Sequence, residues 1–308
     1  MILLHFLWEA QRMFDSKRNA IILMSLVVVV WGSELCLGRA LINTFSTVNV
    51  LMFKYTAALI GVTVMKKVFA RDEKTEKKDF IMYFLATFFG VVLYMICEYT
   101  AMRYMPISLV TIVLGFVPVV SIIIDRILYG KRMTGKIILG VAGSVIGVAI
   151  VIGTDFHLLF EGRLIGYILA FLAVISWNAY NFMMTPLSGK YSDVTAGFNQ
   201  ILCAFLMMLP MQLTHLPEVS LLTPGMVVGI IYLGLVSAMI GYIVEPIALR
   251  NLGPTTTGIF SNFLPVTSTV FAWAFLGQSL TIVQIIGCAI VIGFSCLVIV
   301  EVGKRDGA

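Results

Sequence analysis

Apolar residues run through this chain in long stretches, each closed by a short cluster of charged or turn-forming residues. Stretches of about 18 or more apolar residues with few charges are long enough to cross a bilayer as α-helices. Strands of a membrane barrel would instead alternate apolar and polar residues, which these stretches do not. The pattern predicts an all-α polytopic membrane protein with ten transmembrane helices. Their expected limits are 20–40, 48–66, 80–101, 106–124, 134–153, 163–183, 194–213, 225–246, 252–274 and 281–300.

The amino-acid composition supports the assignment as a membrane protein and reduces the number of functions to consider. Apolar residues make up 60% of the 308 residues and charged residues 12%, against roughly 45–50% and 25% in soluble domains. The five cysteines lie in apolar stretches without a CxxC pair, and the three histidines are scattered outside the spans. We therefore expect no metal site and no cofactor. Since the chain also has no P-loop, HExxH or GxSxG motif, we do not expect an enzyme or an ATP-driven pump.

Basic residues are distributed unevenly between the two sides of the predicted bundle. Seventeen of the 21 fall in alternate connections and in the terminal segments, whereas the opposite connections carry only Arg39, Arg103 and Arg163. Connections rich in Lys and Arg stay in the cytoplasm, so both termini are expected there, in an inner (plasma) membrane of the bacterial type. Residues 1–19 form a cytoplasmic N-terminal segment, either a short amphipathic helix on the membrane surface or a frayed start, and residues 301–308 a cytoplasmic tail. The net charge of +5 therefore does not indicate nucleic acid binding.

The two halves of the chain align with each other at a constant offset of 147 residues (245 − 98). This offset matches Glu98 with Glu245 and Arg103 with Arg250, and it also matches Pro118 with Pro265. The sequence thus predicts two five-helix repeats, 20–153 and 163–300. Because five is an odd number, the second repeat enters the membrane from the other side. Inverted repeats are typical of transporters that alternate access about a site near the midplane.

Several local strings resemble the drug/metabolite transporter superfamily in its EamA-type branch. They are WGSELCLGRA in the first span, AMRYMPISLVTIVLGFVPVV across spans three and four, ISWNAYNFMM in the sixth, and IYLGLVSAMIGYIVEPIALRNLGPTTTGIFSNFLPVTSTVFAWAFLGQSLT across spans eight and nine. The resemblance covers about residues 20–300 and implies ten helices, with helices 1, 3, 4, 6, 8 and 9 around a central cavity. Members move amino acids, nucleobases, organic cations, sugar phosphates and drugs, so the resemblance does not identify the substrate. Lys54 stands where the family often has Arg.

Ionisable residues within the spans are candidates for function, because a charge at membrane depth is costly unless it faces a cavity or a partner. Glu34 and Glu98 lie about six residues from the outer ends of their helices, and Lys54 lies at a similar depth in the second span. Either glutamate could pair with Lys54 and leave the other free. A static ion pair or snorkelling of the long side chain is the alternative for Lys54.

The charged residues shared by both repeats are candidates for proton coupling or gating. Glu98 would serve an outer gate and Glu245 an inner one, set against Arg103 and Arg250. For the arginines, a static ion pair near a helix end is an equally good explanation. Pro118 and Pro265 interrupt helices four and nine at equivalent points. Since proline removes an intrahelical hydrogen bond, each is a candidate hinge or a fixed kink.

Aromatic and amide side chains supply the remaining candidates for substrate binding. Aromatic faces near carboxylates suit an organic cation, although aromatic residues are also common in interfacial belts and ordinary packing. Buried amides could bind a polar substrate or form hydrogen bonds between helices. The candidate binding residues are Trp31, Glu34, Tyr94, Glu98, Trp177, Asn178, Asn181, Tyr242 and Asn262.

Two transport functions remain open from the sequence. The first is a secondary transporter, with proton-coupled export of a small polar metabolite such as an amino acid. The second is a carrier of an organic cation, with Glu34 as its counter-ion and Trp31, Tyr94 and Trp177 as an aromatic cage. A membrane scaffold or a lipid-modifying enzyme would belong to another class, but no cluster of catalytic side chains supports an enzyme. The expected partners are a small-molecule substrate, the lipid bilayer and protons; monomer and homodimer both stay open.

Overall fold

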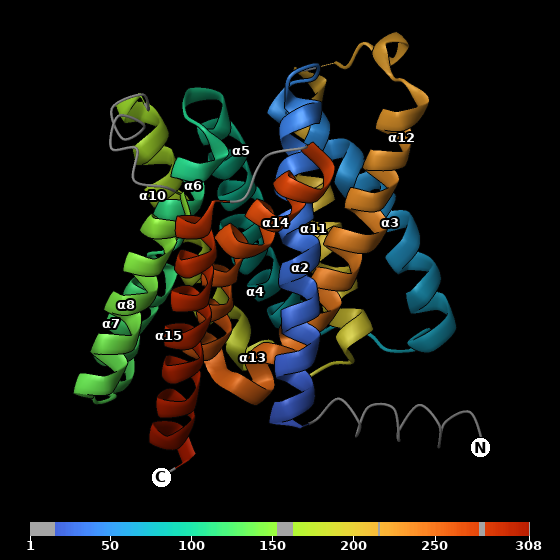
Figure 1. Ribbon diagram of the computed structural model, residues 1–308. Helices are drawn as coiled ribbons and strands as arrows, with labels where there is room; N and C mark the ends of the chain where they lie inside the picture. The colour runs from blue at the N-terminus through green and yellow to red at the C-terminus, as the bar shows by residue number, and fades with distance from the viewer. Residues whose placement is uncertain (1–15, 153–162, 215, 277–280, 308) are drawn as a thin grey trace.

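The computed structural model describes residues 16–152, 163–214, 216–276 and 281–307, and every regular element among them is helical. Most of the helices run side by side along one direction (Figure 1), as expected for an all-α membrane protein. The α-helices are α2 (Lys17–Ile42), α3 (Thr47–Phe69), α4 (Lys77–Thr87), α5 (Tyr94–Tyr104), α6 (Ile107–Leu114), α7 (Val117–Tyr129), α8 (Gly135–Ile152), α10 (Leu164–Met184), α11 (Asp193–Leu213), α12 (Pro224–Ile231), α13 (Ile240–Ile259), α14 (Leu264–Leu276) and α15 (Ile282–Gly307).

Length and apolar composition identify eight long candidate spans and one shorter apolar helix, Gly135–Val151, in the part of the chain that the structure describes. The longest segment, Pro224–Phe271, contains 48 residues and is interrupted at Gly253, where φ is 77° and ψ is 166°. A side chain would be strained at this φ, whereas glycine adopts it readily. The following Pro254 has no backbone N–H to donate. The chain therefore turns at Gly253 within this segment, and ten spans stay the number predicted from the sequence.

Hydroxyl side chains fix where several of these helices begin. Ser16 and Ser46 accept hydrogen bonds from the backbone N–H groups of Asn19 and Asn49, each at 3.1 Å. Ser192 and Thr223 cap α11 and α12 in the same way. Such caps satisfy backbone donors that have no partner within the helix. The spans thus start at polar residues that directly precede apolar stretches.

Two segments of π-helix lie at corresponding places in the two halves. One (Phe88–Leu93) joins α4 to α5 and the other (Tyr232–Met239) joins α12 to α13. A π-turn adds a residue to the helical repeat, so it changes which side chains face inward, and such bulges are frequent at functional sites. In the first, Gly90 allows the ring of Tyr180 to approach closely, since a Cβ atom there would lie 2.1 Å from its Cγ.

The predicted interruptions at Pro118 and Pro265 are present. Helix α6 ends at Leu114, and α7 begins at Val117 with Pro118 in its first turn. A short 3-10 segment, Phe260–Phe263, precedes α14, whose second residue is Pro265. The Asn178 side chain donates to the Val117 carbonyl at 3.2 Å, which ties the first interruption to α10.

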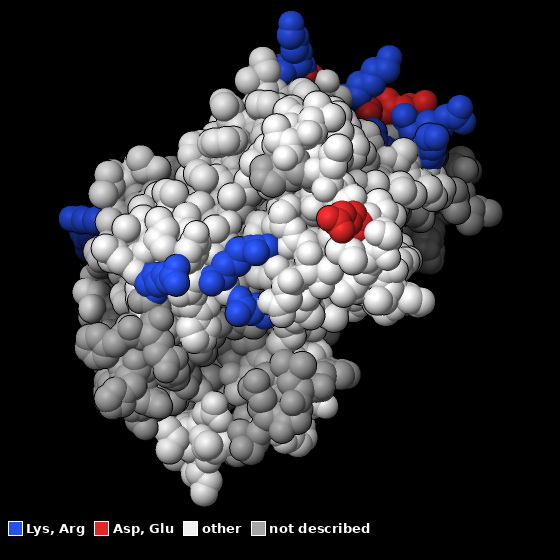
Figure 2. Space-filling view, turned by 90° about the horizontal axis from the view of Figure 1, so that it is seen from above, with Lys and Arg blue, Asp and Glu red and all other residues white. Residues whose placement is uncertain are grey.

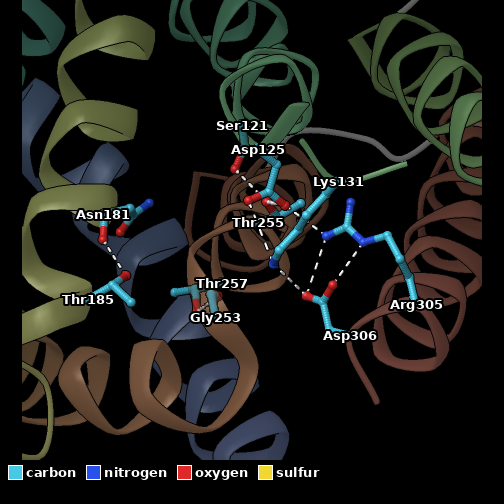
Figure 3. A network of polar contacts seen from close by, with 10 residues as sticks. All are labelled: Ser121, Asp125, Lys131, Asn181, Thr185, Gly253, Thr255, Thr257, Arg305 and Asp306. Atoms are coloured by element: carbon cyan, nitrogen blue, oxygen red, sulfur yellow. Dashed lines mark hydrogen bonds and ion pairs between the residues drawn. The ribbon is translucent and has the colours of Figure 1, made fainter. Parts of the chain in front are cut away.

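The start of α2 and the end of α15 lie at the lower end of Figure 1, here called the basic end. It carries a network of polar contacts, shown in Figure 3. Asp125 of α7 is fully buried there and accepts from Arg305 of α15 at 2.7 Å and from Thr255 of α13. Lys131 and Arg305 also bond Asp306. Seen from the opposite end (Figure 2), the middle of the surface shows only scattered charged groups.

Candidate functional site

A small cavity lies between α2, α5, α10 and the start of α14. Its volume is about 30 Å³, enough for one or two water molecules, so the helices are closed around it in this conformation. Five of its lining residues were candidates from the sequence. The lining residues are Trp31, Glu34, Leu35, Tyr94, Met95, Glu98, Trp177, Ser261 and Leu264.

Glu34 is held in a dense set of contacts. Lys54 of α3 forms an ion pair with Glu34 Oε1, and Tyr99 donates to the same oxygen at 2.9 Å. Ser237, in the second π-segment, donates to Oε2. Glu34 and Lys54 are 4% and 1% exposed. Of the two glutamates that could take Lys54 as a partner, the structure pairs it with Glu34, and the charge of Glu34 is balanced within the protein.

Glu98 is also buried, at 3% exposure, but its surroundings are different. Tyr94, one turn earlier on α5, donates to Glu98 Oε1 at 2.9 Å. Among the described residues, no lysine, arginine or histidine forms an ion pair with Glu98. An isolated carboxylate in a buried site is costly in its charged form. Glu98 is therefore the carboxyl group at the cavity for which the described residues provide no ion pair, since Lys54, which also lies within electrostatic range of it, is bonded to Glu34.

Aromatic rings form the wall of the cavity beside Glu98. Trp177 stands at the centre of this wall, and its ring centroid lies 4.9 Å from that of Tyr94 and 5.6 Å from that of Trp31. The two tryptophans meet edge to face, at 84°. The predicted aromatic group thus comes together from α2, α5 and α10. Such rings can attract a cation through their faces.

Glu245 lies in a second polar site behind Trp177. It is fully buried and lies 2.8 Å from the Tyr180 hydroxyl, which in turn lies 2.6 Å from Gln200 Oε1. In the amide orientation that satisfies both neighbours, Asn181 donates to Glu245 Oε1 at 3.1 Å and accepts from Trp177 Nε1 at 3.2 Å. Asn181 thus connects the second carboxyl group to the wall of the cavity.

Three other candidates lie outside the cavity lining and are bonded within the protein. The Tyr242 hydroxyl lies 3.2 Å from that of Tyr55. Asn178 donates to backbone carbonyls, and Asn262 donates to Ser144 at 2.8 Å. These contacts hold helices together. In this conformation they are not positioned to touch a ligand in the cavity.

The two arginines shared by the repeats bond to groups other than the glutamates. Arg103 donates to the carbonyls of Ile42 and Phe45, at 2.9 and 2.7 Å. Arg250 pairs with Asp193 at 2.8 Å at the basic end. Arg103 therefore ties α5 to the end of α2 and the connection after it, and Arg250 ties α13 to the start of α11.

Residues outside the predicted binding set complete both polar sites. Tyr99 and Ser237 hold Glu34, whereas Tyr180 and Gln200 face Glu245. Gln200 could have been recognised as an amide within an apolar span. The hydroxyl groups gave no comparable signal, because Ser and Tyr are ordinary residues in membrane helices.

The comparisons with known proteins agree with this architecture. A family model described as "EamA-like transporter family" matches residues 18–153 and again residues 164–300. The "Uncharacterized transporter YyaM" of Bacillus subtilis is 23% identical over 229 residues, which cover 70% of this chain and 72% of that protein. The "Probable terminal-alkyne amino-acid exporter" of Streptantibioticus cattleyicolor is 19% identical over 260 residues, which cover 84% of this chain and 86% of that protein.

A solved crystal structure has the same fold. It superposes with a TM-score of 0.76 at 14% identity and covers 94% of this chain and 98% of its own. The two family matches together span most of the chain. The helical bundle and its apolar spans are what a membrane transporter of this family requires. The chain belongs to the EamA-like transporter family and is a multi-pass membrane transporter.

Proposed function

We propose that this transporter exports a small metabolite with an amino group, such as an amino acid, by alternating access coupled to protons. The observation that carries the proposal is Glu98, a buried carboxyl group at the cavity that forms no ion pair with a described cation. A substrate ammonium group would supply the missing positive charge. The name of the Streptantibioticus cattleyicolor relative supports export of an amino acid.

The rest of the cavity fits the same class of substrate. Trp31, Tyr94 and Trp177 offer ring faces to a cation. Glu34 and Lys54 already form an ion pair with each other. Glu98 is therefore the carboxyl group left to accept hydrogen bonds from the ammonium group of a substrate. The cavity holds only about 30 Å³, so the substrate must enter when the helices separate.

Two features support movement of this kind. The helical path is interrupted between α6 and α7, beside Pro118, and before α14, beside Pro265, which gives each half a place to bend. The basic end is closed by ion pairs between separate helices, such as Arg305 with Asp125 and Arg250 with Asp193. Such contacts can break and re-form without disturbing the apolar core.

Proton coupling would use the unbalanced carboxyl groups of Glu98 and Glu245. A buried carboxyl group without a cation is favoured in its neutral form and ionises when water or a cation reaches it. Exchange of a proton for a substrate ammonium group would leave the net charge of the site unchanged. Inward proton movement would then drive export.

The aromatic wall favours a second candidate function, transport of an organic cation such as a quaternary amine. Three rings meet beside a carboxyl group, and quaternary ammonium groups bind in aromatic cages. In this version the geometry favours Glu98 over Glu34 as the counter-ion, because Lys54 already balances Glu34.

Transport in proteoliposomes tests the proposal and separates its versions. Uptake of labelled amino acids and quaternary amines would be measured with and without an imposed pH gradient, for the wild type, Glu98→Gln and the control Glu301→Gln. We expect amino-acid transport driven by the gradient, lost in Glu98→Gln and kept in the control. Transport of quaternary amines alone would favour the second candidate. Transport that ignores the gradient would contradict proton coupling, and an unchanged Glu98→Gln would contradict the proposed role of Glu98.

A further inference from the structure

Trp177 and Glu245 are joined by a chain of hydrogen bonds that begins at the cavity wall and ends on α11. It runs from Trp177 Nε1 to Asn181 and Glu245, both contacts being close to 3 Å, and then through the Tyr180 hydroxyl to Gln200. Gln200 donates its own amide to the carbonyls of Ala196 and Tyr242, at 3.2 and 3.4 Å. The chain therefore links the substrate cavity to a carboxyl group outside its lining.

The number of protons available for these hydrogen bonds decides whether Glu245 is neutral or charged in this conformation. Tyr180 has one hydroxyl proton but two oxygen acceptors, Gln200 Oε1 at 2.6 Å and Glu245 Oε2 at 2.8 Å. If Glu245 were charged, one of these oxygens would have no donor. An unsatisfied buried acceptor costs about 1–3 kcal/mol.

A proton on Glu245 Oε2 satisfies every member of the chain at once. Glu245 then donates to the Tyr180 oxygen, and Tyr180 donates to Gln200. At the other end, Asn181 donates to Glu245 Oε1 and accepts from the Trp177 N–H. All donors point the same way along the chain, an arrangement in which the hydrogen bonds strengthen one another. The closed conformation thus holds Glu245 in its neutral form.

We infer that Asn181 is a positioning residue that couples the protonation of Glu245 to Trp177, the ring at the centre of the cavity wall. This inference rests on the proton coupling proposed above. When Glu245 loses its proton to water, Tyr180 turns its hydroxyl proton to the new carboxylate. The Asn181 amide is then drawn toward a full negative charge, because hydrogen bonds to ionised groups are shorter and stronger.

Trp177 moves with that amide because its N–H is bonded to the Asn181 oxygen. Trp177 also contacts Tyr94, which holds Glu98. Loss of a proton at Glu245 therefore changes the wall that a substrate touches. Coupling between two sites is reciprocal, so a substrate that displaces Trp177 also changes the proton affinity of Glu245.

The other groups near Glu245 do not provide a competing pH response near neutrality. In the part of the chain that the structure describes, the titratable side chains seen to interact with it are tyrosines, namely Tyr180 on α10, Tyr94 on α5 and Tyr242 on its own helix. Arg250, further along α13, pairs with Asp193 on α11. Tyrosines and arginines keep their charge state between about pH 5 and pH 8. A titration sensed by Trp177 in this range would come from Glu245 or from Glu98.

Fluorine NMR of the full chain labelled with 5-fluorotryptophan tests the inference. The chain has four tryptophans, and Trp177→Phe identifies the Trp177 resonance. We expect this resonance to shift with pH in the wild type. In Glu245→Gln it should stay at the acidic wild-type position at every pH, since a glutamine offers the same donor and acceptor as the neutral acid. In Asn181→Leu the shift should be lost. It should persist in the control Ser176→Ala, which removes a hydroxyl on the same helix that donates to the Phe89 carbonyl of the first π-segment.

The remaining outcomes would overturn the inference. They are a resonance that does not titrate in the wild type, a titration that survives in Asn181→Leu, or one that is lost in Glu98→Gln and kept in Glu245→Gln. If Asn181→Leu does not fold, the comparison of wild type with Glu245→Gln still decides whether Trp177 senses this carboxyl group. Failure of proton coupling is separate: transport that ignores a pH gradient beside a normal Trp177 titration would refute the proposed coupling alone.

Discussion

The ammonium group of Lys54 on α3 is bonded to the carboxylate of Glu34 on α2, and both side chains are almost fully buried. Tyr99 and Ser237 donate to the same carboxylate. Buried pairs of this kind hold together because each charge satisfies the other and further hydrogen bonds complete the site. This pairing leaves Glu98 as the carboxyl group at the cavity that has no ion-pair partner among the described residues.

Replacing one partner of this pair should lower the free energy of unfolding far more than replacing both. Lys54→Met leaves Glu34 as an uncompensated buried charge and is expected to lower the free energy of unfolding by about 3–5 kcal/mol. The double variant Lys54→Met with Glu34→Gln should recover most of that loss. Denaturant titration of the purified protein measures the cycle. The matched control is Lys78→Met, which breaks an exposed pair with Glu76 and should change stability by less than about 1 kcal/mol. Equal losses for single and double variants would contradict a mutually compensating pair.

Gly90 offers a second test, because its position leaves no room for a side chain. A Cβ atom at this residue would lie within 2.4 Å of three Tyr180 atoms near the root of that side chain. Gly90→Ala should therefore displace Tyr180 and lower the unfolding free energy by about 1–3 kcal/mol. It should also weaken transport, since Tyr180 bonds Glu245. Gly229→Ala is the control, because a methyl group added there would meet no packing neighbour within 4 Å. A Gly90→Ala protein as stable and active as this control would refute the packing argument.

The broad architecture could be predicted from the sequence for simple physical reasons. Apolar stretches long enough to cross a bilayer identify helices directly, and most of the expected spans correspond to candidate spans. Glu34, Glu98 and Glu245 were recognisable because a carboxylate in an apolar stretch is costly without a purpose. Trp31, Tyr94 and Trp177 were recognisable as aromatic neighbours of those carboxylates. All but Glu245 of these residues line the cavity.

The pairing of charges could not be predicted in the same way. Glu34 and Glu98 lie at similar depths, so depth does not choose the partner of Lys54; the rotation of each helix does. Ser237 reaches Glu34 from a π-segment, where the ordinary helical period no longer gives the inward face. Asp125 and Arg305 are 180 residues apart in the chain and lie near helix ends, where charges are common. Contacts of this kind depend on the tertiary arrangement.

Breaking the Asp125 network should open the basic end. Arg305→Gln leaves the buried Asp125 without its 2.7 Å ion pair, so conformations that expose Asp125 to water become more favourable. With Ser121→Cys as a reporter in a background without the five native cysteines, a water-soluble thiol reagent should react faster when Arg305 is replaced. Adding Asp125→Asn should restore slow labelling, because no charge is left to hydrate.

Two comparisons make that experiment decisive. Lys304→Gln is the control, because this neighbouring lysine pairs with Glu301 near the surface and should leave labelling unchanged. Thr255→Val removes a neutral donor to Asp125 and should have a smaller effect than Arg305→Gln. If Arg305→Gln labels at the wild-type rate, the network does not close this end.

Glu73, in the connection between α3 and α4, predicts a pH dependence of stability. Burial raises its pKa, but hydrogen bonds from Ser192 and Thr195 outweigh burial, so the pKa lies below its ordinary value. A carboxylate with a lowered pKa stabilises the fold above its unfolded pKa of about 4.3 and loses that contribution as the pH falls through the folded value. The wild type should therefore lose more thermal stability than Glu73→Gln as the pH falls from about 6, above the unfolded pKa, to about 3. Parallel losses in the two proteins would show that Glu73 contributes nothing.

The Asp125 network has no counterpart at the equivalent position of the other half of the chain. At the repeat offset of 147 residues, position 125 corresponds to position 272, which is alanine. If the two ends were closed by equal contacts, the inward-open and outward-open states would have an equilibrium constant near one. Each additional 1.4 kcal/mol, roughly, at one end changes that constant tenfold. Under the proposed alternating access, any stability that this network adds beyond the Arg103 contacts at the other end biases the resting population toward the state closed at the basic end, and the driving gradient must overcome that bias in every cycle.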